Sequence, residues 1–147
     1  MTRTIPRALV SEATGMPEAA LPEGDLPLPR YAEHYGAFLA ALAQEEAEGH
    51  PEQWTDAVMG QLIASDPALA LAAIRAILAG ARDEAEVAAL AGGALEELVL
   101  ADGAAVIDDL EAGADPAMRA ALALLDIPPH ERDPAVWPRI AALASAT

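Results

Sequence analysis

Apolar residues that recur at three- and four-residue steps are the feature that most constrains how this chain can fold. In residues 90–99 they follow the spacing of one buried helical face: Leu90, Ala91, Ala94, Leu95 and Leu98. The acidic pair Glu96 and Glu97 points away from that face. Strict alternation of apolar and polar residues is absent along the chain, and β-branched residues are sparse. The sequence therefore predicts an all-α fold.

Two adjacent glycines, Gly92 and Gly93, lie inside this predicted helix at an energetic cost. A glycine in a helix interior loses roughly 0.8–1 kcal/mol relative to alanine. We expect the close approach of a neighbouring helix to offset that cost, so that both glycines are structural. A kink is the second interpretation, and a ligand resting on exposed backbone is the third.

About seven helices are predicted, over residues 30–48, 52–64, 67–79, 83–101, 104–112, 116–125 and 133–144. Three of them begin at an Asp-Pro pair, because Asp caps the free amides and Pro tolerates the first helical position: Asp66-Pro67, Asp115-Pro116 and Asp133-Pro134. The pair Asp102-Gly103 is expected to break the fourth helix from the fifth. An irregular bundle fits this pattern, and so do stacked helical hairpins of the HEAT type, since the first two Asp-Pro pairs are 49 residues apart.

Residues 1–29 hold five of the twelve prolines. Such dense proline removes amide donors and favours an extended path, with at most one helical turn at residues 8–13. Leu21, Leu26 and Leu28 indicate that this proline-rich arm packs along the body. We therefore divide the chain into an arm, residues 1–29, and a single helical domain, residues 30–147.

The charge balance is strongly acidic, with 24 acidic residues against eight basic ones, all arginine, and a net charge of −16. Residues 31–74 contain seven carboxylates and residues 83–118 contain ten, and neither window contains an arginine or a lysine. Phosphate would be repelled, so nucleic-acid binding is disfavoured. An acidic surface that meets a basic protein partner is one explanation, and simple solubility is the other.

Several chemistries lack the residues they need. The chain has no cysteine, which removes disulfides and thiolate metal sites and favours a cytoplasmic location. No apolar tract is long enough to span a membrane, and the first residues do not form a signal peptide. His34, His50 and His130 are far apart in the sequence, and no serine lies in a nucleophile motif. We expect no cofactor and no metal.

Acidic residues in the second half are the candidates for function. Asp108, Asp109 and Glu111 should face water, because the apolar residues Val106, Ile107 and Leu110 occupy the buried face of the same helix. Glu96, Glu97 and Asp115 complete the candidate set for partner binding. A cluster of Glu96, Asp108, Glu111 and Asp115 could instead hold a divalent cation or serve as acid and base, and a solvated acidic face is the simpler alternative.

Two further residues are expected to be structural. Arg119 is the predicted ion-pair partner of Glu96, since an acid flanked by core leucines usually needs a cation. Trp54, at an apolar helical position, is predicted to be a core residue.

The stretch from Leu90 to Val99, followed by Gly103, Asp115-Pro116 and Arg119, resembles an uncharacterised bacterial family, a domain of unknown function with a leucine-alanine-alanine-glycine-proline-leucine-glutamate signature. The resemblance extends from about Trp54 to Leu125. Within the signature, Gly92 replaces an alanine and Ala94 replaces a proline. The resemblance implies an all-helical bacterial domain in which the Glu96 region matters, and it implies no activity.

These observations predict a non-enzymatic, acidic protein-interaction module, immunity- or inhibitor-like, that docks a basic protein. The alternatives are a metal-dependent enzyme built on the carboxylate cluster and a mimic of nucleic acid. One continuous acidic face would favour docking, and a concave carboxylate cluster would favour the enzyme. Two spaced rows of carboxylates would favour the mimic. The sequence leaves the oligomeric state open.

Overall fold

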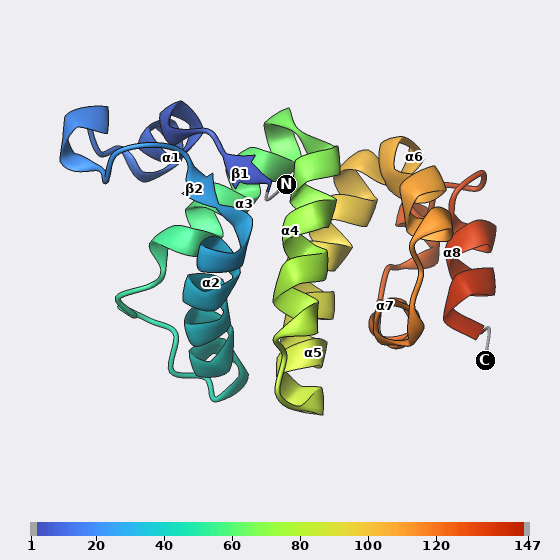
Figure 1. Cartoon of the computed structure of the whole chain (residues 1–147). Coiled ribbons are helices and arrows are strands. Elements are labelled where there is room, and N and C mark those ends of the chain that lie inside the picture. Colours follow the sequence, from blue (N-terminus) through green and yellow to red (C-terminus); the bar gives the residue numbers. More distant parts are fainter. Residues whose placement is uncertain (1–2, 146–147) are drawn as a thin grey trace.

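The computed structural model describes residues 3–145 and confirms the all-α prediction. The chain runs from one side of the molecule to the other, with the N-terminal arm at one end and the last two helices at the opposite end (Figure 1). The helices are α1 (Arg7–Thr14), α2 (Leu28–Ala43), α3 (Trp54–Ser65), α4 (Pro67–Ala79), α5 (Glu84–Leu90), α6 (Glu96–Ala112), α7 (Pro116–Leu122) and α8 (Trp137–Ser145).

Helix α4 is the centre of the packing. It contacts α2, α3, α5, α6 and α7, so helices from both ends of the molecule pack against it. It buries more of its length than an amphipathic helix would, and its buried residues are Leu69, Ala70, Leu71, Ala73, Ile74, Ile77 and Leu78. One continuous apolar cluster extends from α4 to the arm and to α8.

Two of the three Asp-Pro pairs begin helices as predicted. The Asp66 side chain accepts a hydrogen bond from the Leu69 amide at the start of α4, and Asp115 does the same for the Met118 amide of α7. The prediction for the third pair is wrong. Asp133 accepts from the Ala135 amide in a turn, and α8 begins only at Trp137.

The arm is more structured than its prolines indicated, and the prediction of an extended path with at most one turn is wrong for residues 7–14. Helix α1 fills the proline-free interval between Pro6, which precedes its first residue, and Gly15, which ends it with a φ of 75°. A short antiparallel pair closes the arm at its base, where β1 (Thr4–Ile5) pairs with β2 (Leu26–Pro27). Ile5 and Val10 are buried in the main core, so the arm packs on the body.

Helix α2 ends at Ala43, five residues before the predicted end at residue 48. Glu45 adopts a left-handed conformation with a φ of 60°, which stops the helix before the expected Gly-Pro boundary. Inside α2, Tyr31 is fully buried and its hydroxyl donates to the Thr55 carbonyl at 2.7 Å. Burial raises the pKa of Tyr31 well above its usual value, so this donor stays protonated.

Gly92 and Gly93 do not mark a close helix crossing, and that prediction is wrong. Both are exposed, and a Cβ added at either position would meet nothing within 4 Å. The stretch forms instead a π-helical segment, η2 (Ala91–Leu95), between α5 and α6.

The reason for the π-helical segment lies in the spacing of the buried residues. Buried positions repeat every four residues, at Glu86, Leu90, Ala94 and Leu98. In an α-helix each four-residue step overshoots one full turn by about 40°. A wider turn with i to i+5 hydrogen bonds absorbs that drift and keeps the face buried.

The expected break at Asp102-Gly103 is a kink, so the predicted fourth and fifth helices share α6. Asp102 has non-helical φ and ψ angles of −137° and 25°. Gly103 is the glycine that meets a neighbour here, since a Cβ would lie 3.2 Å from Cγ1 of Val136. The close approach that we expected at Gly92 and Gly93 therefore occurs at Gly103, ten residues after Gly93.

Candidate functional site

The acidic side chains predicted on α6 are at the surface. Val106, Ile107 and Leu110 are buried as expected. Asp108, Asp109 and Glu111 are exposed on the other side of the same turns. Glu97 is also exposed near the start of α6, and Glu96 is partly buried. Helix amphipathicity alone was sufficient to place these carboxylates in water.

An arginine that the sequence analysis did not single out joins two of these acids. Arg139 of α8 donates from Nη2 to Asp108 Oδ1 at 2.7 Å, and it also hydrogen-bonds both carboxylate oxygens of Glu111. The hydrogen bond from Arg139 lowers the pKa of the Glu111 carboxyl. The predicted α6 face is therefore partly neutralised, and only Asp109 of its three acids lacks a side-chain cation partner among residues 3–145.

Two other predictions for the acidic set need correction. Asp115 is the N-cap of α7, so its Oδ1 is already occupied by the Met118 amide. Glu96 and Arg119 do not form the predicted ion pair. Arg119 donates instead to the main-chain carbonyls of Ala114 and Leu143, because its place on α7 faces the end of α8. Arg119 is structural, as expected, but through carbonyl acceptors.

Including Arg119, four of the eight arginines donate to main-chain carbonyls in this way. Arg75 donates to the Asp109 carbonyl, Arg132 to the Ile127 carbonyl, and Arg7 to the Glu18 and Leu21 carbonyls. Only Arg82 and Arg139 form ion pairs with carboxylates within residues 3–145. A guanidinium bound to a neutral carbonyl leaves the acidic side chains uncompensated, so the surface keeps most of its negative charge.

The histidines and carboxylates do not assemble a metal centre in residues 3–145, where no group of three or more candidate ligands is suitably placed. His34 lies 2.9 Å from Glu52 through Nδ1, and His50 packs against Phe38. Trp54, predicted as a core residue, is partly buried against this core, and its Nε1 donates to Glu52. The four acids Glu96, Asp108, Glu111 and Asp115 therefore do not form the predicted cation cluster.

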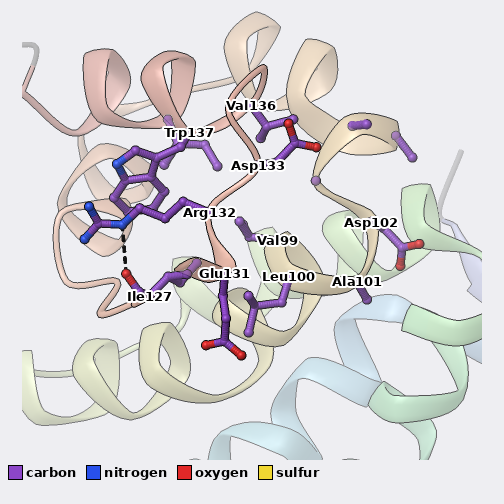
Figure 2. Close-up of a pocket in the computed structure, with 14 residues that line it drawn as sticks. Val99, Leu100, Ala101, Asp102, Ile127, Glu131, Arg132, Asp133, Val136 and Trp137 are labelled. Atoms are coloured by element: carbon purple, nitrogen blue, oxygen red, sulfur yellow. Dashed lines mark hydrogen bonds between the residues drawn. The ribbon is translucent and has the colours of Figure 1, made fainter. Parts of the chain in front are cut away.

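A pocket of about 280 Å³ lies where α6 kinks, facing the segment that leads into α8 (Figure 2). Its wall includes Trp137, and the Arg132 guanidinium lies 4.4 Å from the centre of that ring. Leu100 is 47% exposed beside them and adds an apolar surface. The hollow lies beside the kink at Asp102, and the sequence pattern, which indicated two separate helices, did not predict it.

Three carboxylates line this pocket, but they do not converge. Figure 2 shows Glu131 and Asp133 pointing to opposite sides of their segment, with Asp102 apart from both. Oδ2 of Asp102 is buried without a hydrogen-bond partner, and none of the three acids pairs with a cation within residues 3–145. An acid-base pair needs two groups that reach one reacting atom, and this arrangement does not supply them.

No helix in residues 3–145 has the length and apolarity needed to cross a membrane.

Residues 42–147 match the model of a family of unknown function (DUF6869). No curated protein and no solved structure matches the chain. The matched part covers most of the helical body and leaves out the arm and most of α2. The bacterial origin and the HEAT-like arrangement stay predictions.

Proposed function

We propose that this chain, which belongs to a family of unknown function (DUF6869), is a non-enzymatic interaction module whose acidic surface docks a basic protein. Immunity proteins and inhibitors of basic enzymes work through such surfaces, and we place the chain in this class, acting in the cytoplasm. The proposed contact is the exposed side of α6, with Asp108, Asp109 and Glu111 at its centre.

The direction of the arginines is the observation that carries this proposal. Four arginines donate to main-chain carbonyls within the molecule, while the exposed carboxylates of α6 share a single arginine. A positively charged surface on the partner, facing these carboxylates, would raise the association rate and set the docking orientation. The absence of a convergent acid-base or metal group in residues 3–145 is consistent with a binding role.

Arg139 gives the proposed surface a specific geometry. The α6 carboxylates can exchange this internal partner for an arginine or lysine of the other protein, because the ion pairs are solvent-exposed and individually weak. The partner that fits would present two or more basic side chains along about one helical turn. Asp109, which has no internal cation, would be the first contact.

The test compares two neutralised variants for partner capture from the native lysate at low and high salt. The first replaces Asp108, Asp109 and Glu111 by Asn, Asn and Gln. The matched control replaces Glu45, Glu46 and Glu48 by Gln, which makes the same change in charge on the exposed loop after α2. We expect a salt-sensitive partner whose association is slowed by the α6 substitutions much more than by the loop substitutions.

Equal slowing by the two variants would mean that only net charge matters and would remove α6 as the docking surface. Capture that is insensitive to salt, with the α6 variant binding like the wild type, would overturn the proposal. The Debye length falls from about 10 Å at 0.1 M to about 3 Å at 1 M salt, so the salt range is wide enough to decide.

A further inference from the structure

We propose that the cavity beneath the N-terminal arm binds a small amphipathic carboxylate, a molecule with an apolar body and one anionic end. The cavity is open to solvent, has a volume of about 440 Å³ and is lined by the arm, the first turns of α2 and the start of α3. Figure 1 shows the arm at the end of the molecule opposite α7 and α8. This site does not use the acidic surface of α6, so the two proposals stand separately.

The walls of the cavity are predominantly apolar. Val10 of α1, Leu21 and Leu26 of the arm, and Trp54 of α3 line it. Met16 stands at its edge with 45% of its surface exposed, although it is a large apolar residue. Small-molecule sites typically have volumes of roughly 300–1,000 Å³, apolar linings and a few polar groups, and this cavity has those properties.

Two arginines and a histidine line the same cavity: Arg7, Arg30 and His34. Arg7 fixes the arm by donating through Nη2 to the carbonyls of Glu18 and Leu21, but its Nε is buried without an acceptor. Because this Nε has no accessible surface, Arg7 contributes to the cavity by fixing the arm and through its charge, and it does not offer a free N–H to a ligand.

Arg30 supplies a free charge. It is exposed on the first turn of α2, and it forms no ion pair and no side-chain hydrogen bond among residues 3–145. His34 uses Nδ1 toward Glu52, which leaves its other ring nitrogen available. Arg30 is therefore the group best placed to hold an anion at the cavity.

Two acids, Glu23 and Asp25, line the cavity beside the two arginines. Asp25 Oδ1 already accepts the Arg7 main-chain amide at 3.0 Å. Glu23 is exposed on the arm. Acids outnumber arginines three to one in the whole chain, whereas two arginines balance two acids at this cavity. An arginine without a side-chain partner, Arg30, therefore lies beside an apolar wall, and this combination favours an anion with an apolar body.

The experiment uses Trp54 as the reporter. The chain has two tryptophans, and Trp137→Phe leaves Trp54 alone while keeping a ring for Arg132. Octanoate is titrated into this protein below micelle formation, beside octanol, which has the same chain length and no charge. We expect saturable changes in Trp54 fluorescence with octanoate and an affinity about tenfold weaker for octanol, because charge-assisted hydrogen bonds are roughly twice as strong as neutral ones.

Variants then assign the site. Arg30→Gln should weaken octanoate binding about tenfold and leave octanol unchanged. Arg82→Gln, which removes an exposed arginine outside this cavity, should change neither. Ala20→Phe, placed in the exposed 3₁₀ turn Glu18–Ala20 that borders the cavity, should weaken both ligands by filling the space.

Three results would overturn the proposal: no saturable response to octanoate, equal affinity for octanoate and octanol, or an Arg30→Gln variant that binds octanoate like its parent. Circular dichroism of each variant confirms that the helices are intact, and Ala20→Phe provides a second assignment of the site that does not depend on charge.

Discussion

The two ends of the molecule are held together by different chemistry. In the N-terminal region, comprising the arm, α2 and α3, large rings pack on one another, and Tyr31 contacts Tyr35 and Trp54 with ring centres 6.0 and 6.4 Å apart. In the C-terminal region, comprising α6, α7 and α8, Trp137 is the single aromatic residue. There, arginine hydrogen bonds connect the helices: Arg75 of α4 reaches α6, Arg119 of α7 reaches α8, and Arg139 of α8 reaches α6.

The comparison shows how a helical region rich in small side chains compensates for the apolar area that it does not bury. Alanine-rich helices bury little area per residue, so the C-terminal region supplements apolar packing with arginine hydrogen bonds between elements. Each arginine used in this way no longer neutralises a carboxylate. The acidity of the surface is therefore linked to how the interior of this region is held.

The largest expected effect is in the aromatic region. Tyr31→Ala removes a fully buried ring and its hydrogen bond to the Thr55 carbonyl. We expect a loss of about 3–5 kcal/mol in the free energy of unfolding, as for other large aromatic truncations. Urea unfolding measures it. A loss below that of Trp137→Ala, whose side chain is only partly buried, would break the comparison.

Next comes the arginine that joins α4 to α6. Arg75→Met keeps the apolar stem and removes the hydrogen bond to the Asp109 carbonyl, so we expect a loss on the order of 1 kcal/mol. Gly113→Ala should act through the same bond, because its Cβ would lie 2.6 Å from Arg75 Nη2 and displace the guanidinium. Thermal melts of both single variants and the double variant test this. Additive losses would show that Gly113 acts independently of Arg75.

A smaller effect, of opposite sign, is expected in the π-helical segment. Gly93→Ala adds a methyl group into open space and should stabilise the protein by about 0.5–1 kcal/mol through helix propensity. Gly103→Ala is the control, because its Cβ would press on Val136 at 3.2 Å and offset the same gain. Denaturant midpoints of the two variants would show the difference. A destabilised Gly93→Ala protein would mean that the π turn itself requires glycine.

The smallest effect concerns the exposed ion pairs of Arg139. The hydrogen bond from Arg139 holds the pKa of Glu111 below the ordinary carboxyl value of 4.5. A carboxyl with a depressed folded-state pKa stabilises the fold above its unfolded pKa, and this stability is lost as pH falls through the folded pKa. Arg139→Gln should therefore narrow the stability difference between pH 7 and pH 3. An unchanged profile in melts at the two pH values would show that the pairs contribute nothing.

Local sequence patterns predicted the helices well where one short-range rule decided the outcome. Helix α4 has the predicted bounds, because Asp66 caps it and Pro67 fixes its first turn. The exposure of Asp108 and Asp109 followed from the apolar residues beside them. The π-helical segment was predictable in principle, since the four-residue repeat of buried positions is visible in the sequence, but the glycines were assigned to packing instead.

Contacts between distant elements were not predictable in the same way. Arg139 reaches α6 across 28 residues, and nothing near it in the sequence indicates which helix α8 will face. The pairing of Glu96 with Arg119 failed for the same reason, because the acceptors of Arg119 are main-chain carbonyls, which every residue has. The arm cavity depends on the closure of β1 on β2, a pairing of two residues each that leaves no periodic pattern.

The π-helical segment η2 also divides the continuous helical stretch from α5 to α6 into two units whose backbone hydrogen bonds can open separately. Its wider turn interrupts the i to i+4 ladder between α5 and α6, and the exposed glycines beside it restrain the backbone least. Local opening follows such discontinuities. Amide hydrogens of Ala91–Leu95 should therefore exchange with deuterium ahead of those in the later turns of α6, and α5 should exchange as a unit of its own.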